Sequence, residues 1–174
     1  MALAVCLLFD ARSELTIRRL WQRLEDDGVP TLLSHTHGRH VPHLSYAVLR
    51  SFDLDRVREA LHLLPDEEPM TLHFDAVGMF RRSRTWLVPA VTSDIARRQE
   101  RVVEAVESTG ADLHQHYRPG VWVPHSTLAP RTTLERLPTV AAAVFDVLPL
   151  VTTLDRAALI DTSTGTRHVL EVLP

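Results

Sequence analysis

Two short segments of the chain carry the same pattern, a histidine followed two positions later by a hydroxyl residue. Residues 42–45 read PHLS and residues 124–127 read PHST. Side chains alternate between the two faces of a β-strand, so the histidine and the hydroxyl of each segment point the same way. If the two strands meet, two imidazoles and two hydroxyl groups face one cleft. That set supplies a general acid, a general base and two partners for phosphate oxygens.

Displacement at a phosphodiester is a reaction that needs this set. It requires an activated attacking oxygen and a protonated leaving oxygen on opposite sides of phosphorus. His43 and His125 suit both tasks because an unperturbed imidazole has a pKa of ~6.5. Ser45 and Thr127 would stabilise the developing charge on the equatorial oxygens. A mechanism with one neutral and one charged histidine predicts a bell-shaped pH profile.

The spacing of apolar residues predicts five elements in the first half of the chain. The first helix is expected to begin at Ser13, with Leu15 on its apolar stripe. The third strand alternates, with Leu72, Phe74 and Ala76 on one side. Strands are expected over 2–9, 41–49 and 70–79, and helices over 13–26 and 53–63.

The second half is expected to repeat this order. Its first helix is capped by Ser93 or Asp94 and stopped by Gly110. Its second helix begins near Thr132, with Glu135 three residues on as in a capping box. Strands are expected over 84–91, 121–129, 144–159 and 166–173, and helices over 93–109 and 132–143.

The two halves share one spacing. Their first strands start 82 residues apart, at residues 2 and 84, and His43 and His125 are also 82 residues apart. This agreement indicates an internal repeat. One histidine–hydroxyl strand in each half predicts a pseudo-two-fold cleft, a common place for a ligand site. We therefore expect one domain over residues 1–174, with lobes of about 1–80 and 81–174.

The composition is that of a compact globular protein. The chain has 174 residues, of which 45% are hydrophobic and 24% charged, and no apolar run approaches the ~20 residues that span a bilayer. The apolar segment 1–9 reads as a core strand rather than a signal peptide. The single cysteine, Cys6, cannot form an internal disulfide, so a reducing cytoplasm is the expected compartment.

The basic residues exclude several chemistries. The sequence contains 19 arginines and no lysine. Without lysine, no lysyl-adenylate, no Schiff base with pyridoxal phosphate and no lysine-containing phosphate-binding loop can form. The net charge of −3 argues against a broad footprint on long nucleic acid. It allows a small anionic substrate held by a few arginines.

The sequence resembles the two-histidine phosphoesterase superfamily, and within it the 2′-5′ RNA ligase-like proteins. The resemblance covers nearly the whole chain: the opening strand and helix, both histidine–hydroxyl strands, and the stretch from Phe80 to Trp86. Residues 122–129, WVPHSTLA, are similar to the family's second motif. The resemblance implies a bilobal, pseudo-two-fold α+β fold, with antiparallel sheets lining a central cleft and helices on the outside.

Members of this family open 2′,3′-cyclic phosphates or cleave related phosphodiesters, and some join RNA ends without ATP. The resemblance implies that His43 protonates the leaving ribose oxygen and that His125 activates water. Ser45 and Thr127 would bind the non-bridging phosphate oxygens. The implied partners are nucleotides or RNA ends with a 2′,3′-cyclic phosphate or a 2′-5′ linkage, with no metal and no cofactor.

The sequence departs from the family pattern at three places. Ser45 stands where threonine is more usual, which is chemically conservative. Ser126 stands where an apolar residue normally faces the core, and a buried hydroxyl needs a partner. Similar proteins place an arginine soon after the second motif; here Pro130 intervenes and Arg131 follows one position later.

Loops near the motifs hold further candidates. Arg131, Phe80, Arg39 and Tyr117 are candidate substrate contacts. Residues 35–43 hold four histidines, but a zinc site prefers ligands on rigid elements at set spacing, so a loop at the rim of the cleft is favoured. Residues 114–118 form a second polar loop, a candidate lid. A basic turn between the lobes either contacts nucleotide phosphate or is solvated, and it holds Arg81, Arg82 and Arg84. Trp122 is expected to pack in the core.

Alternative functions remain open on the sequence alone. The same fold could serve as a nucleotide- or RNA-binding module with little turnover, which the intact histidine pair argues against. ATP-independent joining of RNA ends is a second alternative, and a metalloprotein that uses the histidine-rich loop is a third. A serine hydrolase is disfavoured because no Gly-x-Ser-x-Gly elbow is present.

Overall fold

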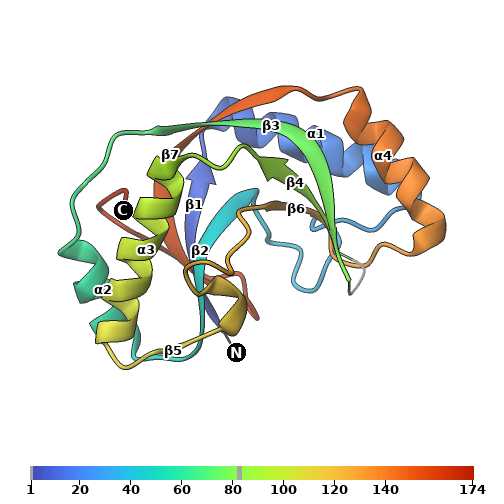
Figure 1. Ribbon diagram of the computed structural model, residues 1–174. Coiled ribbons are helices and arrows are strands. Elements are labelled where there is room, and N and C mark those ends of the chain that lie inside the picture. Colours follow the sequence, from blue (N-terminus) through green and yellow to red (C-terminus); the bar gives the residue numbers. More distant parts are fainter. Residues whose placement is uncertain (1, 82–83) are drawn as a thin grey trace.

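The computed structural model describes residues 2–81 and 84–174 (Figure 1). The first half runs from a buried strand to a long strand that crosses the molecule. Its elements are β1 (Leu3–Phe9), α1 (Ala11–Asp26), β2 (His43–Ser51), α2 (Leu54–His62) and β3 (Met70–Phe80). Arg82, one residue of the basic turn considered above, lies outside the described residues.

The second half adds further strands and two α-helices. Its elements are β4 (Arg84–Pro89), α3 (Ser93–Ser108), β5 (Asp112–Leu113), β6 (Ser126–Ala129), α4 (Leu137–Phe145), β7 (Leu150–Asp161) and β8 (Arg167–Val169). Two short 3-10 helices, η1 (Gln115–Tyr117) and η2 (Leu134–Arg136), precede β6 and α4. The predicted α+β class is confirmed.

All strand pairs of the described chain are antiparallel and join into one eight-stranded sheet. The strand order is β5-β2-β1-β7-β3-β4-β6, with β8 beside β7. The order β2-β1-β7 at one end matches β6-β4-β3 at the other. Strand β3 therefore pairs with β4 of the second half, and β7 pairs with β1 of the first half. The lobes of the fold exchange these two strands, which ties the halves of the chain together.

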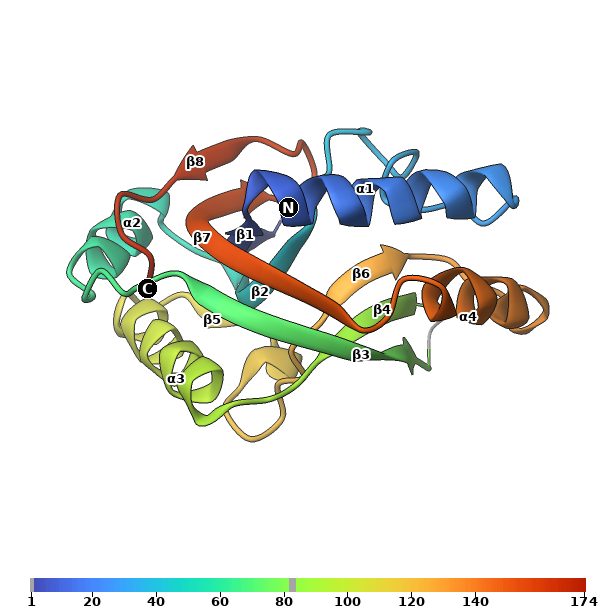
Figure 2. The ribbon, with the colours of Figure 1, turned by 90° about the horizontal axis from the view of Figure 1, so that it is seen from above.

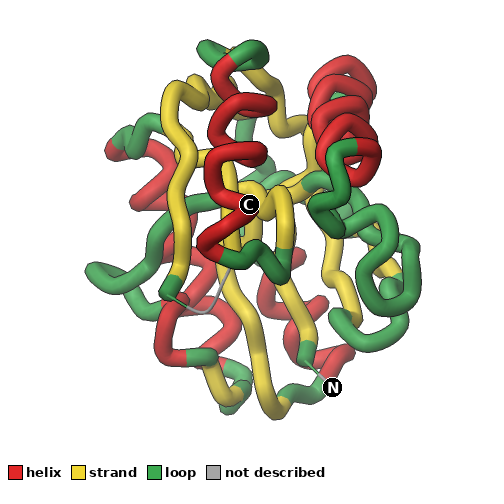
Figure 3. The backbone as a smooth tube through the Cα atoms, turned by 90° about the vertical axis from the view of Figure 1, so that its right-hand side faces the viewer, coloured by secondary structure: helices red, strands yellow, loops and turns green. Residues whose placement is uncertain are grey.

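The helices pack as two pairs at opposite ends of the sheet. Helix α1 packs against α4, and α2 packs against α3 (Figures 1 and 2). In the side view the strands run between the helices, which lie on the outside (Figure 3). The main core joins the helices to the inner face of the strands, and its largest fully buried side chains include Trp21, Tyr46, Phe9 and Phe74.

Several helix starts differ from the prediction. Helix α1 begins two residues early because the Asp10 side chain accepts from the Ser13 backbone N–H. Leu15, predicted on its apolar stripe, is 49% exposed. Helix α3 is capped by Thr92, whose side chain accepts from the Ile95 N–H, and neither Ser93 nor Asp94 caps it.

The segments after each motif also differ from the prediction. Thr132 is buried, with its hydroxyl 3.0 Å from that of Thr85. The chain then forms η2 with no side-chain cap, so the predicted capping box with Glu135 is wrong. Ala76 is exposed because the register of β3 against β4 shifts between Phe74 and Ala76. Residues 144–145 belong to α4 rather than to the strand predicted from 144.

Strand β6 is shorter than predicted. It begins at Ser126, whereas residues 118–122 form a turn in which Val121 and Trp122 donate their N–H groups to the Arg118 carbonyl. Pro124 has no N–H to offer a neighbouring strand. His125 therefore sits directly before its strand, as the last residue of a loop.

Candidate active site

The first motif opens strand β2, and its histidine and hydroxyl share one face of the sheet. His43 pairs with Leu8 of β1, and Ser45 pairs with Cys6. Directly opposed residues in an antiparallel pair lie on the same face. We call this face of β1, β2 and β7 the cleft face. It carries a small apolar cluster that is separate from the main core and consists of Ala4, Cys6, Leu8, Val41, Ala158 and Ile160.

A β-bulge follows the hydroxyl residue of the first motif. Val5 pairs with Ala47 while Cys6 pairs with Ser45, so Tyr46 is an extra residue in β2. The extra residue resets the alternation of side chains. Tyr46 and Ala47 can both be buried in the main core while Ser45 stays on the cleft face.

The second motif repeats this arrangement in the other half of the chain. Thr127 pairs with Trp86 of β4, and the next pair joins Ala129 to Thr85, so Leu128 is the extra residue of a second bulge. In each motif the bulge falls immediately after the hydroxyl residue. The structure thus places Ser45 and Thr127 at equivalent backbone positions.

Both motif histidines are held by the same backbone contact. Nδ1 of His43 lies 2.7 Å from the Val41 carbonyl oxygen, and Nδ1 of His125 lies 2.7 Å from that of Val123. A carbonyl can only accept, so each Nδ1 carries the hydrogen and donates it. Each neutral imidazole therefore keeps a lone pair on Nε2, the atom available for proton transfer.

Two tryptophans brace the motif strands from opposite halves. The indole N–H of Trp21, on α1, donates to the Thr127 carbonyl at 3.1 Å. The indole N–H of Trp122, just before the second motif, donates to the Ser45 carbonyl at 3.0 Å. Each tryptophan bonds to the hydroxyl residue of the other half, directly before the bulge. Trp122, expected as a core residue, packs partly buried against the main core and also makes this bond.

The surroundings of the two histidines differ. His125 lies edge-on to Phe80, with ring centroids 5.0 Å apart, and 5.5 Å from Trp86. Phe80 stacks on Trp86 at 4.7 Å. Gly78 makes room for this indole, because a Cβ there would lie 2.6 Å from the Trp86 ring. His43 instead pairs with the aliphatic Leu8.

Burial favours the neutral form of both imidazoles. Burial lowers the pKa of His125 to about 4, and the bond to Val123 acts in the opposite direction. Burial also lowers the pKa of His43, again opposed by its backbone bond. The charge of His43 further lowers the pKa of His125. Cα atoms of the motif strands β2 and β6 approach within 8 Å of one another, which brings the two motifs together.

Ser45 has neighbours behind it on the cleft face. Its hydroxyl lies 3.5 Å from the buried Cys6 thiol. Burial raises the pKa of Cys6 to about 12, so the thiol stays protonated and unreactive. Burial also raises the pKa of Tyr117 to about 12, and hydrogen bonding to the Ser45 side chain acts in the opposite direction. The candidate contact Tyr117 thus lies beside Ser45.

Arg84, a residue of the basic turn, acts electrostatically on the second motif histidine. Its charge contributes to lowering the pKa values of His125, His35 and Tyr117. Arg84 is exposed and opens β4 opposite Phe80. Its clustering with two other arginines in the sequence was the only signal that pointed to it.

The other arginine candidates lie farther out. Arg131 is exposed, and its charge acts on His35 of the histidine-rich loop. Arg39 is exposed and lines a separate groove with Arg18 and Arg167. The structure therefore gathers His43, His125, Ser45, Thr127, Phe80 and Tyr117, and leaves Arg39 outside this set.

Ser126 is the buried hydroxyl that the sequence flagged. It is fully buried, and its Oγ has no hydrogen-bond partner among the described residues. The equivalent residue of the first motif, Leu44, is fully buried in the main core. In the described part of the chain, no local change of structure at the second motif gives the Ser126 hydroxyl a hydrogen-bond partner.

The histidine-rich loop is held by contacts among its own side chains. The rings of His37 and His40 lie 4.1 Å apart, and the Thr36 hydroxyl is 2.9 Å from Nε2 of His40. Within residues 2–81 and 84–174, no three histidine, cysteine or carboxylate side chains are arranged to hold a metal ion. None of the described helices is long and apolar enough to span a membrane.

The sequence comparison decides the family. The family model described as the 2′-5′ RNA ligase superfamily matches residues 11–166, which include both motifs and most of the sheet. The chain belongs to the 2′-5′ RNA ligase superfamily. Membership places it among the two-histidine phosphoesterases. No curated protein matches the sequence.

Several solved structures share the fold over nearly the whole chain. E. coli LigT, in complex with 3′-AMP, is similar with a TM-score of 0.65 at 16% identity, covering 97% of each chain. TT0787 of Thermus thermophilus gives 0.61 at 17% identity, covering 98% of this chain and 96% of the other. Usb1 of Kluyveromyces marxianus gives 0.54 at 14% identity, covering 99% and 98%. At these identities the likeness concerns the fold alone.

Proposed function

We propose that this protein is a metal-independent phosphodiesterase that hydrolyses 2′,3′-cyclic phosphates or 2′-5′ linkages at nucleotide or RNA ends. The observation that carries the proposal is the matched pair of imidazoles, each fixed through Nδ1 and each with Nε2 free to exchange a proton. A hydroxyl residue stands two positions after each histidine. LigT and Usb1 structures solved with 3′-AMP and uridine monophosphate support a nucleotide ligand.

The reaction divides between the two histidines. His125 accepts a proton from water as the water oxygen bonds to phosphorus. His43 donates a proton to the ribose oxygen as the bond from phosphorus to that oxygen breaks. A 2′,3′-cyclic phosphate opened at its 3′ oxygen becomes a 2′-phosphate with a free 3′ hydroxyl. The two histidines then return to their starting protonation states by exchange with solvent.

The burial of the two histidines affects how readily each one gains or loses a proton. Both imidazoles resist protonation in the free protein because burial lowers their pKa values. An anionic phosphate bound between them favours the charged form, so substrate binding raises the pKa of the acid. Ser45 and Thr127 donate to the non-bridging oxygens, where charge develops.

The test is turnover of a panel of 2′,3′-cyclic nucleotides and 2′-5′ linked dinucleotides in excess chelator. Wild type is compared with His43→Gln, His125→Gln and the control His73→Gln, an exposed residue of β3. Chelator-resistant hydrolysis that either motif variant abolishes, and the control keeps, supports the proposal. A folded wild type that turns over no substrate in the panel, or motif variants that remain active, would refute it.

A further inference from the structure

A second concave surface lies beside the first motif. This groove, with a volume of about 560 Å³, is lined by Arg18, Arg39, His40, Val41, Thr166 and Arg167. Three of these residues are arginines, and no carboxylate lines it. We call it the arginine groove.

The arginine groove is continuous with the cleft face. Val41 lines the groove, and its carbonyl holds Nδ1 of His43. Arg167 of β8 pairs with Ile160 of β7, which pairs with Ala4 of β1. Directly opposed residues share a face, so Arg167 lies on the same face of the sheet as Ser45.

The distance between the two sites follows from the sheet. Strand β8 lies three strands from β2, through β7 and β1. At ~4.8 Å between neighbouring strands, this separation is ~14 Å across the sheet. Arg167 is level with Ala4, whereas His43 is level with Leu8, four residues along β1, which adds ~13 Å along the strands. The two residues therefore lie ~20 Å apart, and stacked nucleotides rise ~3.4 Å each, so a strand that starts at the histidine pair reaches the groove within about six nucleotides.

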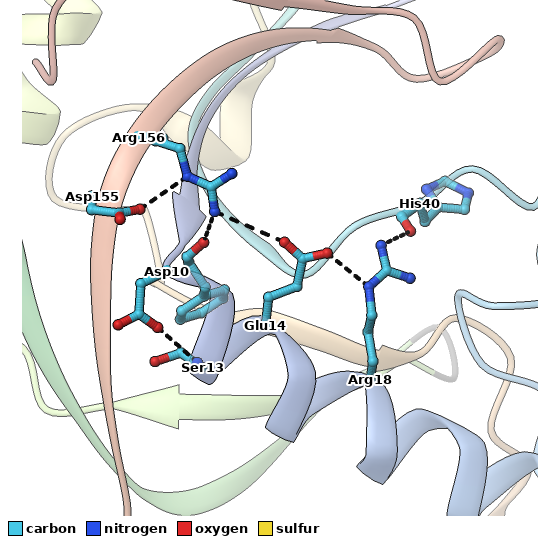
Figure 4. Close-up of polar contacts among 8 residues, drawn as sticks. Asp10, Ser13, Glu14, Arg18, His40, Asp155 and Arg156 are labelled. Atoms are coloured by element: carbon cyan, nitrogen blue, oxygen red, sulfur yellow. Dashed lines mark hydrogen bonds and ion pairs between the residues drawn. The ribbon is translucent and has the colours of Figure 1, made fainter.

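The charge of the arginine groove is largely uncompensated. Arg39 and Arg167 have no carboxylate within ion-pair distance in the described part of the chain. Arg18 is the exception: its Nε donates to Glu14 at 2.8 Å, and its Nη2 to the His40 carbonyl at 3.4 Å (Figure 4). The bond to His40 anchors the loop that carries the groove to α1.

The groove is also preformed. The His37 ring packs on Gly165, where a Cβ would lie 2.5 Å from the ring and 3.0 Å from Cβ of Arg39. Nδ1 of His37 accepts from the Arg39 backbone N–H at 3.0 Å. These contacts fix the backbone of Arg39 against the turn that leads into Arg167. Guanidinium groups suit phosphate, which they bind through forked hydrogen bonds.

We propose that the arginine groove binds a second phosphate of the substrate, so that the protein acts on oligonucleotide ends in preference to mononucleotides. This inference rests on the proposed function. The groove recognises a backbone phosphate, because most of its charged donors are arginines and no phenylalanine, tyrosine or tryptophan lines it. It explains how a chain with net charge −3 can hold an RNA strand through a few local arginines.

The experiment compares two substrates that end in the same 2′,3′-cyclic phosphate, a mononucleotide and a hexanucleotide. Wild type should have the higher kcat/KM for the hexanucleotide. Arg167→Gln and Arg39→Gln should each reduce that preference about tenfold, the usual loss for one charge-assisted hydrogen bond. Each variant should also lower the dependence of log KM on log salt by ~0.7. Arg19→Gln, an exposed arginine of α1, is the matched control and should change neither quantity.

Equal kcat/KM values for the two substrates in wild type, or a preference that both variants retain, would overturn the inference. If no substrate is turned over, the proposed function fails separately. Binding of a labelled hexanucleotide with a 3′-phosphate, measured by fluorescence anisotropy, then still tests the groove. Arg167→Gln should weaken that binding about tenfold. Displacement of the hexanucleotide by a phosphopeptide of equal charge, and not by unlabelled RNA, would also overturn it.

Discussion

The two motif strands share their backbone and differ in their surroundings. In both, histidine Nδ1 bonds to the carbonyl two residues back, a bulge follows the hydroxyl residue, and an indole N–H bonds to that residue's carbonyl. Around this common frame, His43 has an aliphatic neighbour and His125 has two aromatic ones. Backbone contacts therefore fix the geometry, while side chains set the environment of each imidazole.

This division suits a reaction that needs one acid and one base. In the proposed mechanism, equivalent backbones would present the two Nε2 atoms to opposite sides of one phosphate. Unlike surroundings allow their pKa values to separate, as acid and base roles require. A pair with identical surroundings would have no intrinsic preference for either role.

The largest expected effect comes from removing either imidazole. His43→Gln and His125→Gln should each lower kcat by about 10²- to 10⁴-fold. A substrate with a p-nitrophenyl leaving group needs no proton donor, so it should restore activity to the variant that lacks the acid and not to the other. Rates with both leaving groups check this. Restoration of both variants to the same extent would contradict separate roles.

Removing a hydroxyl should cost less. Ser45→Ala and Thr127→Val should each lower kcat about 10- to 100-fold, because each removes one neutral donor to the phosphate and leaves both histidines in place. KM should change less than kcat if the bond strengthens in the transition state. Steady-state kinetics with one cyclic nucleotide measures both constants. An effect confined to KM would show that the hydroxyls bind the ground state alone.

The tryptophan braces are shared features that the sequence did not predict. Trp21→Phe and Trp122→Phe keep an aromatic ring and remove the N–H, leaving the Thr127 or Ser45 carbonyl short of its donor. Each should lower the free energy of unfolding by about 1–2 kcal/mol. Each should also lower kcat, because the bulge that sets the hydroxyl is loosened. Urea unfolding and kcat are the two readouts; lost stability with unchanged kcat would limit the indoles to a structural role.

The sequence predicted the features that depend on local pattern. The histidine–hydroxyl motifs, the buried strands and the helix predicted over residues 53–63 follow from residue type and short spacing, and the structure contains them, with that helix over Leu54–His62. The family assignment is confirmed by the family model. The roles of His43 and His125 remain predictions.

Features that depend on distant contacts were missed. The exchange of β3 and β7 between lobes joins residues far apart in sequence, and no local pattern records it. The bonds from Trp21 and Trp122 span 106 and 77 residues. The short β6 depends on a turn and a proline that hydrophobic periodicity ignores. Tertiary contacts decided the strand exchange and the tryptophan bonds, whereas a local turn and a proline decided the length of β6.

The depressed pKa values predict acid-sensitive folding. A histidine in the unfolded chain has a pKa of ~6.5, so it binds a proton more readily than the buried His125 or His43 of the folded protein. Lowering the pH therefore stabilises the unfolded chain. The contribution of these neutral histidines to the free energy of unfolding is complete above about pH 6.5. It is lost as the pH falls toward about 4, the pKa of His125 and of His40.

Urea midpoints measured between about pH 7.5 and 4.5 check this expectation. The midpoint of wild type should fall with pH, and that of His125→Gln should fall less, because one of the contributing groups is gone. His73→Gln changes an exposed residue of β3, and its urea midpoint should follow that of wild type across this pH range. A variant curve parallel to that of wild type would show that His125 is not protonated on unfolding in this range.

The smallest expected effect concerns a buried position where the two motif strands differ, Leu44 in the first and Ser126 in the second. Ser126→Ala removes a buried hydroxyl that has no partner in the described chain, and the small side chain leaves little new cavity. Stability should stay unchanged or rise by about 1 kcal/mol, with kcat unaffected, because Ser126 faces away from Thr127. Leu44→Ala is the matched change in the first strand and should cost about 2–5 kcal/mol. Urea unfolding measures both, and a marked loss of stability in Ser126→Ala would mean that its hydroxyl has a partner after all.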